Sequence, residues 1–566
     1  MDAAQGGVTR AEWRWVAIAA GLVMALTCVP YVVGAAASNE AWRFTGFVLN
    51  VADGNSYIAK MQWGAAGNLL FKLPYTAVEH DGVLIYSFFI WLGWAVGVVM
   101  GWLGPLGLHS ALVMTYHVVR VAVGFGLLLV GYRWVAAFVD DVWWRRLGWV
   151  MLALGGGLGW LQLALMGNSG WPPPVEIYSP EAFTFLMMFL LPHLTFARLC
   201  WMAGLLTYVR GLEGGGWRWP LATSVLWLLA ALAQPGGLPL AFGLIGAQSL
   251  LLMVLSIWRD DEVDATPGKF APLVGRSLWM GPVAALPALM LVVYTLAVLV
   301  LSPVFQAWNA QNVLTPSPVV DYVFAWGLLM IGAVLGLRPL WRRNRLLAMV
   351  AVVWLVVIPV LLYAPTPFQR RIVEGYQWLL VGLAVAGLSQ VRWQRVARML
   401  AVAGVAVSVP GALLIVFFGT LTASEPLRMP DGPVSRAFTP THEVAAFAFI
   451  AERLGERAPV VAAPDVANVL PAYAPVVGIG GHGVETINYA ESAERIMTLY
   501  LPTTRDWERY EAWVGLGAPY VIVGPSEADA YNGAFDPQYV TGDFRAPIAP
   551  IYAWEGVSVW ALDEGR

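Results

Sequence analysis

Long apolar runs constrain this chain more than any other feature of its sequence. Most of them reach the roughly 20 residues that a helix needs to cross a bilayer. Hydrophobic residues make up 59% of the 566 positions and charged residues only 12%, whereas soluble domains carry about a quarter charged residues. The sequence therefore predicts a mainly α-helical, polytopic membrane protein. The runs are Trp13–Ala35, Val83–Leu103, His109–Val130, Leu147–Met166, Phe183–Val209, Leu221–Leu232, Leu238–Trp258, Leu278–Leu301, Val319–Leu337, Leu346–Leu362, Tyr376–Leu388 and Met399–Leu421.

Charge and motifs exclude several functional classes. The net charge of −3 gives no reason to expect nucleic acid as a partner. The two cysteines, Cys28 and Cys200, lie inside apolar runs and are interpreted as core residues rather than a disulfide. Walker loops, GxSxG elbows, HExxH and paired CxxC motifs are absent, so NTPase, serine hydrolase and structural zinc functions lack support.

Arginine clusters between the apolar runs predict the orientation, because basic residues favour the cytoplasmic side of short loops. The clusters are Arg10/Arg14, Arg133/Arg145/Arg146, Arg210/Arg218, Arg259/Lys269/Arg276, Arg338/Arg342/Arg343/Arg345 and Arg392/Arg395/Arg398. We expect a plasma (inner) membrane protein with eleven to thirteen crossings, a cytoplasmic N-terminus and an extracytoplasmic C-terminal part. The alternation fails near the start. Either Val83–Leu103 does not fully cross, or one helix is miscounted.

The chain changes character after residue 422. Short β-type runs at Val460–Asp465, Val476–Gly483 and Tyr520–Pro525 alternate with helical stretches. This predicts two domains: residues 1–422 as a transmembrane domain with an external loop at 36–82, and residues 423–566 as a small soluble α/β domain. The glycines from Gly478 to Gly483, around His482, indicate either a phosphate-cradling loop or a plain turn.

The first external loop contains the first candidate site. Asp53 sits at a turn beside the membrane, and Ser56–Trp63 reads as a short helix that places Tyr57 and Lys60 near each other. Asp53 is a candidate catalytic acid or base. The alternative is that Asp53 or Asn55 caps the helix, and the two roles are compatible.

Two further polar stretches flank apolar runs. Glu79 and His80, followed by Asp81, either contact substrate or are interfacial residues, and their spacing is weak as a metal signal. Glu176 and Glu181 precede the run that Pro192 and His193 interrupt. Glu181 either takes part in the reaction or complements a helix dipole. A Pro-His break that faces a cavity would explain His193, although a packing role is the usual alternative.

The stretch from Gln369 to Glu374 carries two arginines on the side that basic residues avoid. Arg370 and Arg371 there suit a phosphate or carboxylate ligand, because arginine offers planar, bidentate geometry. An internal ion pair with Glu374 is the alternative. Gln369, Arg370, Arg371 and Glu374 are therefore candidate substrate-binding residues, and the two interpretations are compatible.

Taken together, these segments resemble the GT-C glycosyltransferases, and more closely the bacterial dolichyl- or polyprenyl-phosphate-sugar mannosyltransferase-like membrane proteins. The likeness covers almost the whole chain in order. The stretches that carry it are "ADGNSYIAKMQWG" with "LPYTAVEHDGVLIYSFF", "SPEAFTFLMMFLLPH", "FQRRIVEG", "GGHGVETIN" and "YVIVGP".

The resemblance implies inverting transfer of a sugar from a polyprenyl-phosphate donor to a glycan, lipid or protein acceptor at the outer membrane face. It assigns the base or acceptor-binding acid to Asp53, the second-loop acid to Glu181 with Glu176 as a neighbour, and donor phosphate contact to Arg371 or Arg370. Asp53 is followed by Gly54 rather than a second acid. A divalent metal such as Mg²⁺ or Mn²⁺, held by Asp53 and Glu181, is therefore left open.

Two rival functions share these features. A non-enzymatic lipid-linked glycan transporter or cell-envelope assembly protein could use the same scaffold, but transport predicts polar residues along the whole membrane path. Mid-span polar residues are sparse here, with Arg120, Gln162, Gln234 and Gln248 the main cases. This favours chemistry at one membrane face. A glycan polymerase or ligase would use the same donor class.

Overall fold

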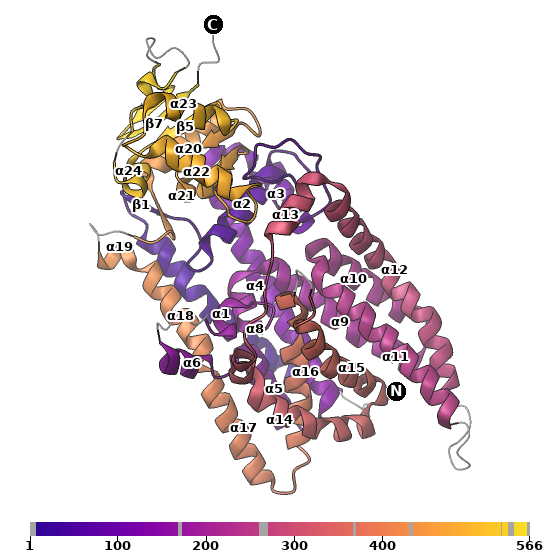
Figure 1. The fold of residues 1–566 in the computed structure, drawn as a ribbon. Helices are drawn as coiled ribbons and strands as arrows, with labels where there is room; N and C mark the ends of the chain where they lie inside the picture. Colours follow the sequence, from indigo (N-terminus) through magenta and orange to yellow (C-terminus); the bar gives the residue numbers. More distant parts are fainter. Residues whose placement is uncertain are drawn as a thin grey trace. The chain divides into compact units, whose positions relative to one another are not determined.

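The computed structural model describes residues 7–167, 173–259, 270–365, 369–429, 434–533, 535–541 and 548–562 (Figure 1). The chain divides into two compact units, each assembled from stretches that are far apart in the sequence. Unit 1 comprises Met1–Cys28, Val119–Leu296 and Val313–Phe417, and unit 2 comprises Val29–Val118, Ala297–Asn312 and Phe418–Arg566. The long helices α1 (Arg10–Ala37), α4 (Gly104–Phe138), α12 (Ala271–Leu301) and α18 (Pro410–Ala423) contribute residues to both.

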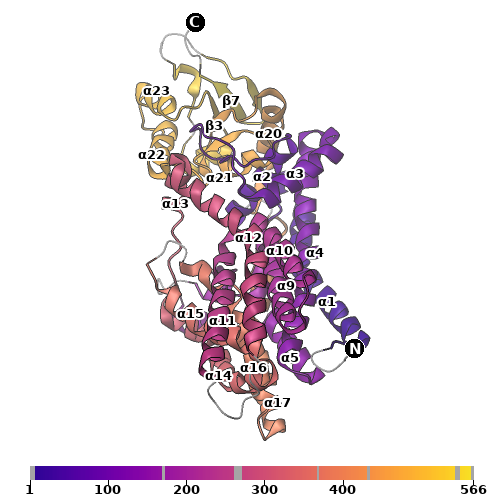
Figure 2. The ribbon, with the colours of Figure 1, turned by 90° about the vertical axis from the view of Figure 1, so that its right-hand side faces the viewer.

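Unit 1 is helical throughout its described residues, and α9, α10 and α11 pack beside one another (Figure 2). Its apolar runs form helices because a helix satisfies every backbone polar group within one segment, as lipid requires. The elements are α5 (Val142–Leu154), α6 (Gly159–Met166), α7 (Val175–Tyr178), α8 (Thr184–Leu190), α9 (Pro192–Gly214), α10 (Arg218–Ala233), η2 (Pro235–Gly237), α11 (Leu238–Arg259), α12 (Ala271–Leu301), α14 (Val319–Arg343), α15 (Arg345–Leu362), η3 (Gln369–Val373), α16 (Tyr376–Leu388), α17 (Gln394–Ser408) and α18 (Pro410–Ala423).

The polytopic helical membrane fold is confirmed. Among the described residues, seven helical segments are long and apolar enough to cross a membrane, or eight if α5 and α6, bent by 43°, form one span. The expected eleven to thirteen crossings also counted α9, α10 and α16. Of these, α10 and α16 have only 16 and 13 residues, and α9 carries two arginines and a glutamate.

Close helix contacts in unit 1 depend on small residues. A Cβ at Gly336 of α14 would lie 1.9 Å from the backbone oxygen of Leu383 in α16, and one at Gly332 would lie 2.8 Å from Ala384 Cβ. Helices in membranes gain association energy from such close backbone approach rather than from a hydrophobic difference with lipid. These glycines therefore let α14 and α16 pack at short range.

Unit 2 contains a hairpin of α2 (Val51–Ala65) and α3 (Ser87–Met100), followed by η1 (Gly101–Leu103) and α13 (Pro303–Gln311). At about 1.5 Å per residue, the 14 residues of α3 span roughly 21 Å, less than the ~30 Å hydrocarbon core. A Cβ at Gly93 of α3 would lie 1.9 Å from Met61 O of α2. The short length of α3 favours the interpretation that Val83–Leu103 does not fully cross the membrane.

The C-terminal part of unit 2 is an α/β domain. Its five-stranded sheet has the order β4-β3-β5-β7-β6, with β3 parallel to β4 and β5 and the remaining pairs antiparallel. The elements are α19 (Glu425–Arg428), α20 (Thr441–Arg453), β3 (Pro459–Val461), α21 (Pro464–Val469), η4 (Leu470–Ala472), β4 (Val477–Ile479), α22 (Tyr489–Tyr500), α23 (Asp506–Gly515), β5 (Tyr520–Val523), α24 (Pro525–Tyr531), η5 (Pro537–Tyr539), β6 (Tyr552–Trp554) and β7 (Val557–Ala561).

The α/β fold of this region is confirmed, since the three expected strands are β3, β4 and β5. The antiparallel strands β6 and β7 were not predicted. The first loop packs on the domain: Ile58 and Met61 of α2 share a core with Val466 and Leu470. In addition, β1 (Trp42–Phe44) pairs with β2 (Phe438–Pro440). The expected domain boundary at residues 422/423 stays a prediction. Unit 2 contains the first loop in addition to the C-terminal α/β domain.

Candidate functional site

Helix α2 positions Asp53 in its first turn. Asn50, in the left-handed conformation with φ of 51°, precedes the helix, and its side-chain amide donates a hydrogen bond to Asp53 Oδ2. The expectation that Asp53 or Asn55 caps the helix was therefore wrong. Asn55 is buried and donates to Asn468 Oδ1 at 2.9 Å. Asp53 instead lies where the helix dipole favours a negative charge.

Asp53 pairs with His482 of the C-terminal domain. Asp53 Oδ1 and His482 Nε2 are 2.9 Å apart. The other ring nitrogen, Nδ1, accepts the backbone N–H of Glu485 at 3.3 Å, so the hydrogen on Nε2 points at the carboxylate. The Asp53 side chain is 38% exposed and that of His482 is 9% exposed. One side of the carboxylate therefore remains open to a ligand.

The pair shifts the pKa of each group toward its charged form. Burial acts to raise the pKa of Asp53, but the hydrogen bond and charge of His482, the Asn50 amide and the charge of Lys60 outweigh it and keep that pKa below its usual value. Burial acts to lower the pKa of His482, whereas Asp53 and Glu485 raise it above its usual value. Asp53 is therefore ionised at neutral pH.

A buried ion pair fixes the loop that carries His482. Lys60 Nζ lies 2.8 Å from Glu485 Oε1, with side chains 0% and 6% exposed. Ser56 Oγ donates to the same carboxylate oxygen at 2.9 Å. The Lys60 ammonium also lies 4.6 Å from the centre of the Tyr86 ring. Lys60 therefore anchors the loop rather than facing solvent.

The glycine-rich loop after β4 is a turn that aims His482 at α2. Gly480 has φ of +78°, a conformation that side-chain-bearing residues rarely adopt. The backbone N–H of Gly481 donates to Gly478 O, and those of Glu485 and Thr486 donate to His482 O. These donors are used within the loop, which favours the turn over a phosphate cradle.

The remaining first-loop predictions have local partners. Tyr57 stacks on Phe89, with ring centroids 4.6 Å apart. His80 accepts the backbone N–H of Leu73 at 2.9 Å through Nε2, and its Nδ1 lies 2.7 Å from Val78 O. Glu79 is exposed, 3.8 Å from Lys72. These contacts order the loop, and a substrate role for the residues stays a prediction.

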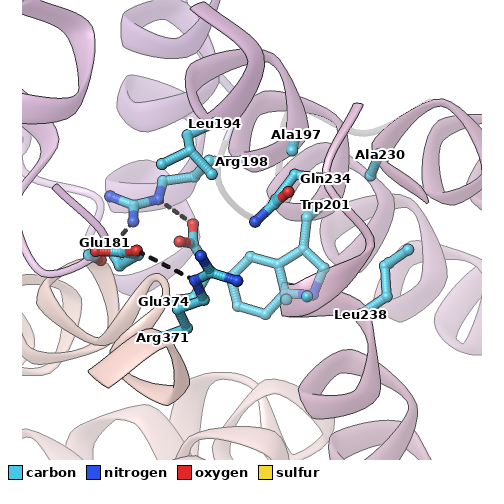
Figure 3. A pocket seen from close by; sticks show the side chains of 12 residues that line it. Glu181, Leu194, Ala197, Arg198, Trp201, Ala230, Gln234, Leu238, Arg371 and Glu374 are labelled. Carbon is cyan, nitrogen blue, oxygen red and sulfur yellow. Dashed lines mark hydrogen bonds and ion pairs between the residues drawn. The ribbon is translucent and has the colours of Figure 1, made fainter. Parts of the chain in front are cut away.

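Unit 1 has a second cluster, around a narrow cavity (Figure 3). Glu374 accepts a hydrogen bond from Arg198 Nε at 2.5 Å, and Glu181 Oε1 lies 3.9 Å from Arg371 Nε. Trp201 lies beside them. The enclosed volume is about 20 Å³, which holds roughly one water. Three predicted site residues, Glu181, Arg371 and Glu374, thus meet here, and the predicted Arg–Glu pairing instead joins Glu374 to Arg198.

Two donors in this cluster have no acceptor among the described residues: Arg198 Nη1 and Trp201 Nε1. Arg198 is 1% exposed and Trp201 is 2% exposed. Buried donors are almost always satisfied, so an unpaired pair beside a cavity indicates a missing acceptor. Burial raises the pKa of Glu374, an effect that Arg198 opposes. The chemistry of this cluster suits an anion.

The other predicted residues of unit 1 lie around these elements. Arg370 lies over the Tyr178 ring at 5.2 Å, and Gln369 donates to Ala364 O. Glu176 accepts the backbone N–H of Trp160 at 3.1 Å and so caps α6. His193 is buried in the first turn of α9, and the residues that line the cavity do not include it.

Sequence reasoning missed several participants: Arg198, His482 as the Asp53 partner, and Glu485. A lone arginine inside the apolar run Phe183–Val209 was a usable signal, since ionisable residues in membrane segments are usually functional. Nothing local could have paired Asp53 with a histidine 429 residues away.

The residues do not form an evident metal centre. Across the described part of the chain, no group of three or more His, Cys, Asp or Glu residues is placed to hold a metal ion. Both Asp53 oxygens face hydrogen-bond donors, Asn50 Nδ2 and His482 Nε2. Because both oxygens already accept hydrogen bonds, the surroundings of Asp53 suit a hydrogen-bonded carboxylate better than a metal ligand. The possible Mg²⁺ or Mn²⁺ stays a proposal without a site.

Comparison with solved structures gave a likeness over the full length of the chain. No family model and no curated protein matches the chain. A solved structure, described as the crystal structure of ArnT from Cupriavidus metallidurans bound to undecaprenyl phosphate, is similar over 98% of both chains with a TM-score of 0.42 and 15% identity. At this TM-score and identity, the likeness does not assign an activity or any site residue.

Proposed function

We propose that this chain is a membrane glycosyltransferase that moves a sugar from a polyprenyl-phosphate donor to a hydroxyl acceptor at the outer membrane face, with inversion. The observation that carries the proposal is the Asp53–His482 pair. The Asp53 carboxylate is partly exposed, its Oδ1 lies 2.9 Å from His482 Nε2, and the pKa of Asp53 is held below its usual value. A carboxylate that is ionised at neutral pH and 38% exposed has no proton of its own and is accessible, so it can accept a proton from an acceptor hydroxyl.

In this mechanism the acceptor oxygen attacks the sugar carbon as its proton passes to Asp53. His482 is a positioning residue, because its Nε2–H fixes the carboxylate and stabilises its negative charge. The carbon–oxygen bond to the lipid phosphate breaks on the opposite face, which inverts the configuration. The phosphate leaves with the bonding electron pair, so no nucleotide is required.

The leaving phosphate needs cationic donors, and the cluster of Figure 3 supplies the right chemistry. Arg198 Nη1 and Trp201 Nε1 are unpaired donors. The Arg371 side chain is 27% exposed and touches Glu181 only at 3.9 Å. With an enclosed volume of about 20 Å³, the site is smaller than a phosphate group and must open to admit one. We assign donor phosphate binding to Arg198 and Arg371.

The test is sugar transfer in proteoliposomes that contain the purified full chain and labelled polyprenyl-phosphate sugars. Asp53→Asn should lower the rate by ~10²–10⁴, the usual worth of a general base. Asp81→Asn is the matched control, since Asp81 is an exposed acid of the same loop. NMR of the product reports the anomeric configuration.

Three outcomes would contradict the proposal. Transfer at the wild-type rate in Asp53→Asn would remove Asp53 as the base. Retained configuration in the product would rule out a single displacement. Movement of intact lipid-linked sugar between leaflets, without transfer to any acceptor, would favour the transporter alternative.

A further inference from the structure

A larger cavity in unit 1 is separate from the cluster of Figure 3. Its volume is about 410 Å³, within the ~300–1,000 Å³ range of ligand pockets. Helix α9 borders both cavities: Arg198 lines the small one and Arg210 lines the large one. These residues are 12 positions apart, which is roughly 18 Å along a helix axis. The proposed transfer reaction does not use this second cavity.

One end of the cavity is basic. Its lining includes three arginines on three helices: Arg133 of α4, Arg210 of α9 and Arg343 of α14. Glu213 lines the same end. Asp140 also holds Arg343 from outside the lining, so three guanidinium groups face two carboxylates and one positive charge remains in excess. A guanidinium group can donate two parallel hydrogen bonds to two oxygens of one phosphate, so this end of the cavity suits a phosphate group.

The protein's own carboxylates only partly neutralise these arginines. Arg343 donates to Asp140 Oδ1 at 2.7 Å. Arg210 and Glu213 lie 3.9 Å apart, with side chains 54% and 37% exposed, and Glu213 Oε1 accepts a hydrogen bond from Asn344 at 2.6 Å. Arg343 therefore has a close partner, whereas Arg210 has only a long and exposed contact. Arg210 remains able to turn toward a ligand.

Apart from Thr207 and Asn344, the rest of the wall is apolar and comes from α4, α9, α10 and α15. It includes Val130, Ala137, Ala203, Leu206 and Leu347. Protein interiors are packed with few voids larger than a water molecule, so an apolar cavity of this size between membrane helices calls for an apolar occupant. The occupant must therefore combine an anionic end with a hydrocarbon part.

The position of the basic end is consistent with one leaflet. Arg133, Arg210 and Arg343 belong to the arginine clusters whose distribution predicts the cytoplasmic side. That leaflet is rich in anionic lipids, and basic pockets between membrane helices on this side bind their head groups. Charge, wall chemistry and position thus select the same kind of ligand.

We propose that this cavity binds an anionic phospholipid, with its phosphate between Arg133 and Arg210 and an acyl chain along the wall formed by Ala203, Leu206 and Leu347. The site is a structural lipid site, distinct from the donor pocket. A soluble phosphate compound shares the head-group chemistry and is the alternative source of the anion.

The test is native mass spectrometry of the delipidated full chain with dioleoyl phosphatidylglycerol, which is anionic, and dioleoyl phosphatidylcholine, which is zwitterionic. Wild type should retain the anionic lipid in clear preference. Each arginine-to-glutamine change should lower its retention roughly fivefold, the usual worth of one basic residue near anionic lipid. The variants are the single change Arg210→Gln and the double change that combines Arg133→Gln with Arg210→Gln. Arg218→Gln is the matched control, because Arg218 is exposed and does not line the cavity.

A second variant, Leu206→Trp, fills the wall without changing any charge. It should reduce retention of phosphatidylglycerol while leaving the arginines in place. Size-exclusion profiles identify variants that fail to fold, and Arg210→Gln alone, at a partly exposed side chain, keeps the test available in that case.

The proposal is overturned if Arg210→Gln retains phosphatidylglycerol as wild type does, if both lipids bind equally, or if Leu206→Trp has no effect. The last measurement is competition between inorganic phosphate and the lipid. If phosphate displaces the lipid in moderate excess and binds with the same dependence on Arg210, the site belongs to a soluble phosphate and the lipid assignment is wrong.

Discussion

Breaking the buried ion pair between Lys60 and Glu485 should release the loop that carries His482. The side chains are 0% and 6% exposed and the charged atoms lie 2.8 Å apart. Glu485→Gln leaves the Lys60 ammonium buried beside the Tyr86 ring without a countercharge. Removing one partner of a buried pair costs about 3–5 kcal/mol. At ~1.4 kcal/mol per factor of ten, loop opening should become ~10²–10³ times more frequent.

Hydrogen exchange of the backbone amides at 480–486, followed by mass spectrometry, measures that opening directly. Lys60→Met should have a similar effect. The double variant, Lys60→Met with Glu485→Gln, removes both charges and should return toward wild type, because an apolar replacement of the whole pair is close to neutral. The exposed pair Arg495–Glu491 on α22, 2.7 Å apart, is the control. Its loss should cost no more than about 0.5 kcal/mol.

Two results would refute this reasoning. The first is a change in exchange of less than about fivefold in Glu485→Gln, which would mean that the loop is held mainly by other contacts. The second is additivity: if the single effects simply sum in the double variant, within ~0.5 kcal/mol, the two charges are not coupled. Because Glu485 N–H holds His482 Nδ1, sugar transfer should fall together with the increase in exchange.

Two further predictions concern unit 2. Glu443 is buried, and burial with the nearby charge of Glu527 raises its pKa. The folded domain should therefore lose stability as pH rises above the unfolded pKa near 4.5. Glu443→Gln should raise the free energy of unfolding at pH 9 by on the order of 1–3 kcal/mol, and the unfolding temperature with it, but have little effect at pH 5. A larger rise in unfolding temperature at pH 5 than at pH 9 in scanning fluorimetry would contradict this. Gly93→Ala places a Cβ 1.9 Å from Met61 O and should cost about 1–3 kcal/mol, whereas Gly101→Ala, with no atom within 4 Å, should leave the unfolding temperature unchanged.

The membrane architecture follows from the sequence by itself. Runs such as Leu278–Leu301 become helices such as α12 because lipid offers no partner for backbone polar groups. The switch to short β-type runs after residue 422 likewise predicted β3, β4 and β5. The strands β6 and β7 escaped because "YAW" and "VSVWA" are short and become strands only through tertiary pairing: β7 pairs with β5, and β6 pairs with β7.

For the candidate site, the sequence identified single residues and missed their partners. Asp53 stood out as an acid beside an apolar run, and Glu181 as an acid before the run that Pro192 interrupts. Arg371 and Glu374 stood out because the pair of arginines lies on the side that basic residues avoid. Arg198 escaped because its run was read only as a membrane segment, and the structure places it against Glu374.

Only the tertiary structure decided which charges meet. Asp53 and His482 are 429 residues apart, and Lys60 and Glu485 are 425 apart. Periodicity and turn chemistry act over a few residues, so they place Asp53 on α2 and His482 in a turn. The packing of α2 against α21 and η4 then brings the two side chains together. That contact depends on the apolar faces that the two segments bury, which local sequence signals do not specify.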